Sequence, residues 1–257
     1  MKTKVIVSRV VALCAMVAVS SGVALAQNQN TNVDFGRLPM GKYYINNNVW
    51  GQGGADASSW ESIWTWGNAS GSWGWGSNWS WTGGNAWDVK AYPSVVLGWH
   101  WGWERTGTGL PVRINANRPV NSKANFSVTG TNTLNVAYDL WFHTQSNPTW
   151  ENNPSDEVMI WLYRQNGAGP LGTFEGTVNL AGTSWDLYRG NIGWNVFSFI
   201  RRSNTTNATM NLRDFYGEIV RRGWMANTKY LTSVQFGSEI FNGNGQLNVN
   251  EYYANVQ

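Results

Sequence analysis

The stretch Asp156-Glu-Val-Met-Ile-Trp-Leu-Tyr163 has the two-residue alternation of a β-strand. Successive side chains of a strand point to opposite faces. One face of this strand carries plain core residues, Val158, Ile160 and Leu162. The other face carries a carboxylate and three large side chains, Glu157, Met159, Trp161 and Tyr163. A carboxylate among large side chains makes poor core, so this strand predicts both a β-fold and a substrate cleft.

Two further runs place acids in the middle of predicted strands. In the run 134–143, the face of Asp139 also carries Asn135, Trp141 and His143. In the run 233–241, the face of Glu239 also carries Gln235, Gly237 and Phe241. Acids are depleted from strands, so three of them on mixed polar and aromatic faces indicate a functional surface.

Two carboxyl groups on one surface are what the cleavage of a glycosidic bond requires. One must be ionised to attack or to steer water, and the other must be protonated to donate to the leaving oxygen. Glu157 and Glu239 are the candidates, and Asp139 is a third group that could hydrogen-bond a catalytic carboxylate and tune its protonation. A single strand glutamate is equally compatible with an edge or solvent-facing position, so the pattern alone leaves that alternative open.

Short alternating runs separated by Gly, Asn, Pro and Ser fill the chain after its first 26 residues. Their number and spacing predict an all-β fold of two antiparallel sheets, a sandwich or jelly roll. Apolar residues at helical spacing in 211–223 predict one short α-helix that covers a sheet face. The predicted strands are Lys42–Trp50, Ser94–Trp101, Ala124–Val128, Thr133–His143, Glu157–Tyr163, Gly172–Leu180, Thr183–Tyr188, Asn195–Ile200, Leu231–Phe241 and Leu247–Ala254.

The first 26 residues have the pattern of a secretory signal peptide. Basic residues precede the apolar run Val10–Val19, and Ala24-Leu-Ala26 forms a small-x-small cleavage site. That run is shorter than the roughly 20 residues that cross a bilayer. We therefore expect secretion of residues 27–257 as a single catalytic domain, with no membrane association after cleavage. Cys14, the one cysteine, lies in the leader, so the mature chain has no disulfide.

The charge balance favours a neutral partner. Removing Lys2, Lys4 and Arg9 with the leader leaves 15 basic and 15 acidic residues, a formal net charge of zero. A chain without a positive field is not suited to nucleic acid. His100 and His143 are too few and too isolated to predict a metal site, and we expect no cofactor. With 14% aromatic and 13% charged residues, the composition fits a large, neutral, hydroxylated partner such as a polysaccharide.

Tryptophan is the second signal of a carbohydrate ligand. Of the 18 tryptophans, 11 lie between Trp60 and Trp103, and indole rings stack on the C–H faces of sugars. About half of them would be expected to fill the core instead. Trp50 follows an Asn-rich run and shares a predicted face with Asn48, which indicates a sugar platform.

The chain resembles glycoside hydrolase family 12, the retaining endoglucanases and xyloglucanases with a β-jelly roll. The resemblance covers most of the mature chain in order, and each motif is weak alone but specific in combination. The motifs are Asn47-Asn-Val-Trp-Gly51, Val89-Lys-Ala-Tyr-Pro-Ser-Val95, Leu110-Pro-Val-Arg113, Ala137-Tyr-Asp-Leu-Trp141, Glu157-Val-Met-Ile-Trp161, the helix at 212–222, Leu231-Thr-Ser-Val-Gln235 and Gly237-Ser-Glu239.

The resemblance implies a role for each matched residue. Glu157 would be the nucleophile, Glu239 the general acid/base and Asp139 the support of the nucleophile. The residues expected to bind sugar are Asn48, Trp50, Met159, Trp161, His100 and Gln235. The segment 51–87 is richer in Trp and Gly than the family pattern, which leaves the shape of the cleft open.

These observations favour a monomeric, secreted endo-β-1,4-glucanase of the cellulase type. A xyloglucan-specific endo-β-1,4-glucanase is the alternative within the same family. A xylanase of related architecture is a further enzymatic alternative. A non-catalytic carbohydrate-binding jelly roll would share the tryptophans and the neutral charge but would not need two carboxylates on separate strands. A structural surface protein is the remaining alternative.

Overall fold

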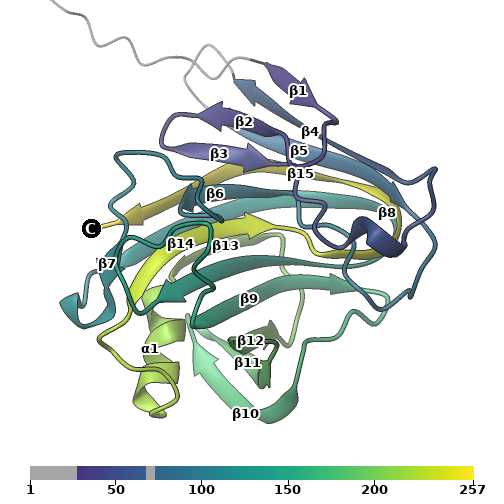
Figure 1. The fold of residues 1–257 in the computed structure, drawn as a ribbon. Helices are drawn as coiled ribbons and strands as arrows, with labels where there is room; N and C mark the ends of the chain where they lie inside the picture. Colours follow the sequence, from purple (N-terminus) through teal and green to yellow (C-terminus); the bar gives the residue numbers. More distant parts are fainter. Residues whose placement is uncertain (1–27, 68–72) are drawn as a thin grey trace, which may run out of the picture.

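The computed structural model describes residues 28–67 and 73–257. The predicted signal peptide lies outside these residues. Two β-sheets pack face to face, with one α-helix beside the lower one in Figure 1, so the predicted fold class is confirmed. In the described part of the chain, no helix has the length and apolar composition needed to span a membrane.

The large sheet carries the predicted acids. Its strands follow the order β2-β3-β6-β14-β8-β9-β12-β11-β10, and all neighbours are antiparallel except β9 and β12, which are parallel. The short β7 (Val112–Arg113) pairs with the start of β14. The bounds are β2 (Arg37–Met40), β3 (Tyr43–Asn46), β6 (Ser94–Gly98), β14 (Tyr230–Gly237), β8 (Val120–His143), β9 (Asp156–Gln165), β12 (Asn195–Arg201), β11 (Thr183–Asn191) and β10 (Thr173–Leu180).

The small sheet contains the Trp- and Gly-rich segment. Its order is β1-β4-β5-β15-β8-β13, so β8 belongs to both sheets. Residues 120–134 of β8 pair with β15, whereas residues 137–143 pair with β14 and residues 134–142 pair with β9. The remaining bounds are β1 (Gln29–Thr31), β4 (Trp60–Gly67), β5 (Trp73–Trp81), β15 (Ile240–Val256) and β13 (Asn207–Asn211), with 3-10 helices at Gln52–Gly54 and Ile114–Ala116.

The main core lies between the two sheets. It takes the face of β9 that carries Val158, Ile160 and Leu162, as the alternation predicted. Helix α1 (Arg213–Arg221) closes the core beneath β9, β11 and β12, where Phe215 packs edge-to-face on Trp185 with ring centroids 4.9 Å apart. The acid-bearing face of the large sheet is therefore the face turned away from both the core and the helix.

The sequence prediction is wrong for one residue of that face. Tyr163 was placed with Glu157, but it packs against the main core. The register of β9 against β8 shifts between Val136 and Ala137, so that the partners of these two residues are Tyr163 and Trp161. The β-bulge adds one residue to β9 and inverts the alternation beyond it.

Candidate active site

Adjacent strands bring Asp139 and Glu157 into direct contact. In the register of β8 and β9, Asp139 lies opposite Met159, and Trp141 lies opposite Glu157. Asp139 and Glu157 are therefore diagonal neighbours on one face, within reach of each other. Their carboxyl groups are joined by a hydrogen bond. Glu157 is 7% exposed and Asp139 is 4% exposed, so this pair is almost entirely removed from solvent.

A tryptophan on the β12 side of β9, away from β8, completes the surroundings of Glu157. The Nε1–H of Trp194 donates a 2.7 Å hydrogen bond to Oε2 of Glu157. Trp194 lies just before β12, the strand that runs parallel to β9. Its ring packs edge-to-face on Trp141, with centroids 5.6 Å apart, which fixes the direction of the donor. Glu157 is thus held by the Trp194 N–H and the Asp139 carboxyl.

Glu239 enters the same site from the junction of two strands. The predicted continuous strand Leu231–Phe241 is wrong, because β14 ends at Gly237 and β15 begins at Ile240. A Cβ at Gly237 would lie 2.2 Å from the carbonyl oxygen of Pro93, so only glycine fits this close approach. The chain changes partner there, and Glu239 lies in the two-residue link rather than mid-strand.

Asn135 of β8 fixes the side chain of Glu239. Its Nδ2 donates a 2.5 Å hydrogen bond to Oε2 of Glu239. The backbone N–H of Asn135 also donates to the carbonyl oxygen of Glu239, at 3.1 Å. Asn135 and Asp139 lie four residues apart on one strand, so β8 positions the surroundings of both glutamates.

Burial is the largest electrostatic effect on all three carboxyl groups. Burial raises the pKa of Glu157 to about 7, while the Trp194 and Asp139 hydrogen bonds act in the opposite direction. Burial and the negative charge of Glu157 raise the pKa of Glu239 to about 7, against the Asn135 hydrogen bond. Burial and the charges of both glutamates hold the pKa of Asp139 well above its ordinary value. A protonated Asp139 can therefore donate to an ionised Glu157, whose charge in turn keeps a proton on Glu239.

Three predicted sugar-binding residues lie beside these acids. Gln235, Asp139 and Met159 form one row across β14, β8 and β9. His100 Nδ1 lies 3.0 Å from Nε2 of Gln235. Burial, with the nearby Arg37 charge, lowers the pKa of His100 to about 4, so this imidazole is neutral at neutral pH. In residues 28–67 and 73–257, no group of three or more His, Asp and Glu side chains is placed to hold a metal ion.

Several polar atoms of this face have no hydrogen-bond partner within the described protein. They include the Nε1–H of the predicted Trp161, which lies opposite Ala137. Buried donors and acceptors are costly unless they are paired. A face with many such atoms is suited to a hydroxylated ligand. The atoms are Tyr44 OH, Asn46 Oδ1, Ser94 Oγ, Trp161 Nε1, Ser198 Oγ and Gln235 Oε1.

Trp50 lies in a turn and Asn48 in the irregular segment before it, not in the strand predicted for them. β3 ends at Asn46, and the Trp50 side chain is 59% exposed, whereas Asn48 is buried. The N–H of Gly51 bonds to the carbonyl of Lys90, and the N–H of Lys90 bonds to the carbonyl of Ile240. These two bonds tie the Trp50 turn to the residue that follows Glu239. The turn that carries the exposed indole is therefore positioned near Glu239.

Sequence reasoning missed the two side chains that hold the glutamates. Asn135 was placed on the face of Asp139, and its alternation could have indicated a partner for a neighbouring acid. Trp194 carried no local signal, because its contact with Glu157 depends on the parallel pairing of β12 with β9. Parallel neighbours are set by the topology of the whole sheet.

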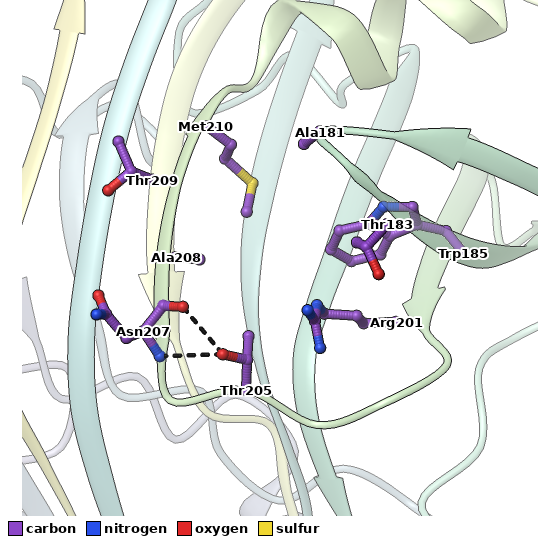
Figure 2. A pocket seen from close by; sticks show the side chains of 9 residues that line it. All are labelled: Ala181, Thr183, Trp185, Arg201, Thr205, Asn207, Ala208, Thr209 and Met210. Carbon is purple, nitrogen blue, oxygen red and sulfur yellow. Dashed lines mark hydrogen bonds between the residues drawn. The ribbon is translucent and has the colours of Figure 1, made fainter.

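A hollow of about 180 Å³ at the edge of the sandwich is separate from this site (Figure 2). It lies between β13 and the β11–β12 region, and its lining contains no acid. Thr205 is tied there to Asn207 by its hydroxyl group. The lining residues are Ala181, Thr183, Trp185, Arg201, Thr205, Asn207, Ala208, Thr209 and Met210.

Comparison with known proteins places this geometry in a family. The model of glycosyl hydrolase family 12 matches residues 41–257. The chain belongs to this family. Endoglucanase S of Pectobacterium parmentieri is 39% identical over 254 residues, which cover 96% of this chain and 94% of that enzyme. The resemblance read from the sequence motifs is confirmed, and the chain is a glycoside hydrolase of the endoglucanase type.

Two further family 12 relatives bear on substrate. The xyloglucan-specific endo-beta-1,4-glucanase A of Aspergillus niger is 28% identical, over 97% of this chain and 100% of that enzyme. The solved structure of the native family 12 xyloglucanase from Bacillus licheniformis superposes with a TM-score of 0.82 at 38% identity, covering 89% of this chain and 100% of that chain. This family 12 fold thus occurs in both endoglucanases and xyloglucanases.

Proposed function

We propose that this chain is an endo-β-1,4-glucanase that hydrolyses its substrate with retention of anomeric configuration. Glu157 is the nucleophile and Glu239 is the general acid/base. The proposal is carried by the double support of Glu157, because the Trp194 N–H and the Asp139 carboxyl both stabilise its ionised form. A nucleophile must be ionised while the acid is still protonated. The raised pKa of Glu239, caused partly by the charge on Glu157, supports the complementary role.

The reaction then proceeds in two displacements. The Glu157 carboxylate attacks the anomeric carbon, and Glu239 gives its proton to the leaving glycosidic oxygen as the C–O bond breaks. Glu239, now ionised, takes a proton from water, which displaces Glu157 from the glycosyl-enzyme intermediate. Asp139 keeps its own proton throughout and donates to Glu157, so it supports the nucleophile without touching the sugar.

We assign the sugar-binding roles to residues near the same acid-bearing face. Trp50 supplies an exposed indole for stacking on a pyranose. Trp161, Gln235 and His100 place polar atoms beside the acids, and Met159 packs in the row of Asp139. Asn48, buried beneath the Trp50 turn, completes the predicted set.

The test is hydrolysis by the purified chain 27–257 of a panel of cellulose, mixed-linkage β-glucan, xyloglucan and xylan. Release of reducing ends from the first two, with the β-anomer as the first product in proton NMR, is the expected result. An initial α-anomer would contradict retention, and activity on xylan alone would contradict the substrate class. Binding without release of reducing ends would contradict the catalytic proposal.

Xyloglucan is a second candidate substrate, favoured by the similarity to the Bacillus licheniformis xyloglucanase. The ratio of kcat/KM for xyloglucan and unbranched glucan in the same panel decides between them. We also propose that the chain is secreted, supported by the leader pattern of residues 1–26, and that it is a monomer. Expression of the whole chain should release a protein that begins at Gln27, and retention of the leader in the cell fraction would contradict this.

A further inference from the structure

The Trp- and Gly-rich segment forms a second aromatic surface on the small sheet. β4 and β5 alternate between a buried and an outward set of side chains. The buried set of β5 includes Trp75 and Trp79, which belong to the core. The outward set of β4 comprises Ser62 and three tryptophans, Trp60, Trp64 and Trp66, and Trp60 is 47% exposed. About half of the tryptophans in this segment therefore have no place in the core.

Glycines seat two of these indoles on the sheet. Trp64 lies opposite Gly76, and Trp66 lies opposite Gly74, in the register of β4 and β5. A Cβ at Gly76 would lie 2.5 Å from Cζ2 of Trp64, and one at Gly74 would lie 2.3 Å from Cζ2 of Trp66. Each ring thus rests on glycine backbone where no other residue would leave room. The glycines of the segment build a flat aromatic platform.

Uncharged polar side chains continue the platform across the sheet. Asn78 of β5 lies between Ser62 of β4 and Gln246 of β15 in register. Ser62 donates a 2.7 Å hydrogen bond to Asn78 Oδ1, and Gln246 donates a 3.1 Å bond to Asn248 Oδ1. The outward positions of these rows carry only Trp, Gly, Ser, Asn and Gln.

The outward positions of β4, β5 and residues 244–248 of β15 carry no charge, because the one acid of β4 points inward. Farther along the same face, Lys123 of β8 and Glu251 of β15 form an ion pair, with Nζ and Oε2 2.7 Å apart. Glu61 is 3% exposed and accepts a hydrogen bond from Trp81 Nε1 at 3.2 Å. A face of indoles, amides and hydroxyls without charge complements a neutral, hydroxylated polymer. It does not complement nucleic acid or an anionic lipid surface, which are bound through positive charge.

We propose that the face formed by Trp60, Trp64, Trp66, Asn78, Gln246 and Asn248, here called the tryptophan face, is a non-catalytic binding site for a β-glucan chain. Alternate residues of a strand are about 6.8 Å apart, so Trp64 and Trp66 contact neighbouring sugars of one chain. Their indoles stack on pyranose C–H faces, while the amides hydrogen-bond hydroxyl groups.

The tryptophan face is separated from the carboxylates by the sandwich itself. It lies on the outer side of the small sheet, whereas Glu157 and Glu239 lie on the outer side of the large sheet, with the main core between them. A short oligosaccharide can occupy only one of these faces. A long or insoluble glucan can be held by the tryptophan face while another chain is cleaved at the acids.

The test compares Trp64→Ala/Trp66→Ala with Glu157→Gln, which alters the acid-bearing face and leaves the tryptophan face intact. Binding isotherms on insoluble cellulose at low temperature measure the tryptophan face. Turnover of a chromogenic cellobioside measures the carboxylates. We expect binding about tenfold weaker in the double variant, because two indole contacts are lost. Glu157→Gln should bind cellulose like wild type and lose cellobioside turnover, whereas the double variant should keep wild-type turnover.

Unchanged cellulose binding by a folded double variant overturns the proposal. A parallel loss of cellobioside turnover also overturns it, because the residues would then act through the catalytic face. If the double variant does not fold, Trp60→Ala decides alone, since this side chain is nearly half exposed. Binding at least about threefold weaker is expected of Trp60→Ala, and wild-type binding would overturn the proposal. Complete inactivity of the wild type on the substrate panel would refute the proposed function but would leave this binding test intact.

Discussion

The Nε1–H of Trp194 donates a 2.7 Å hydrogen bond to Oε2 of Glu157, across the parallel pair of β12 and β9. This bond stabilises the ionised form of a carboxylate that burial otherwise pushes towards protonation. Together with the Asp139 carboxyl, it favours the ionised form of Glu157 against the effect of burial. The proposed mechanism assigns Glu157 the nucleophilic role on this support.

Removing that donor should move the acid limb of the pH–rate profile. In Trp194→Phe the pKa of Glu157 rises, because its carboxylate loses a hydrogen bond. The ionised fraction then falls at every pH below neutrality, and the acid limb of kcat/KM shifts to higher pH. Trp101→Phe is the matched control, since Trp101 packs on Trp141 in the same aromatic group, with centroids 5.2 Å apart. An unshifted acid limb in Trp194→Phe would show that the bond does not tune the nucleophile.

Removing the Asn135 amide should move the basic limb of the pH–rate profile. Its amide donates to Glu239 and favours the ionised form of that carboxyl. Asn135→Ala should therefore raise the pKa of Glu239, keep the acid protonated to higher pH and move the basic limb upwards. The measurement is kcat/KM between pH 4 and pH 9. A downward shift of the basic limb would contradict the assignment of Glu239 as the acid.

Trp50→Ala should weaken glucan binding without unfolding the chain. The indole is 59% exposed, so its contribution to the core is small. Stacking of such a ring on a sugar contributes on the order of 1.5–3 kcal/mol to binding. KM for soluble β-glucan should rise accordingly, with thermal unfolding unchanged and with partial recovery in Trp50→Tyr. Wild-type kinetics in Trp50→Ala would show that Trp50 does not contribute to glucan binding.

Ionisation of the buried Glu157 carboxyl should lower the stability of the folded chain as pH rises. The pKa of Glu157 is raised in the folded chain, so folding favours its protonated form. That stabilisation is present below the unfolded value near 4.3 and is lost as pH rises through about 7. Glu157→Gln stays neutral, so the Tm difference between this variant and wild type should grow in favour of the variant from pH 4.5 to pH 8. A constant difference would mean that burial does not penalise the charge.

The azide products of two glycine variants should differ in configuration. Glu157→Gly cannot form the covalent intermediate, so added azide takes the nucleophile position and gives the α-glycosyl azide. In Glu239→Gly an activated aryl glycoside still forms the intermediate, and azide then gives the β-glycosyl azide. Proton NMR of the products distinguishes the two. Exchanged configurations would mean that the roles of the glutamates are reversed.

The sequence predicted the faces of β9 and β8 well, because period-two alternation directly reports burial in a strand. It separated Val158, Ile160 and Leu162 from Glu157 and Met159 without any partner strand in view. The alternation failed to predict side-chain faces at two places, a β-bulge and a strand break. The bulge before Tyr163 and the break at Gly237 are set by contacts with Val136 and Pro93, which no local pattern records.

The Trp- and Gly-rich segment was the largest gap in the prediction. Its strands β4 and β5 alternate Trp with Gly or Ser, so neither composition nor hydropathy distinguishes them from a low-complexity loop. The tertiary structure resolves the ambiguity, because the glycines of β5 lie beneath tryptophans of β4. Trp194 was missed for a related reason, since only the fold brings its loop to Glu157.

The identity of the nucleophile is tested most directly by trapping the intermediate. A 2-deoxy-2-fluoro cello-oligosaccharide with an activated leaving group should label the chain once, and mass spectrometry of a peptic digest locates the sugar. We expect label on the peptide that contains Glu157, with none in Glu157→Gln. Label on the peptide that contains Glu239, or full turnover by Glu157→Gln, would contradict it.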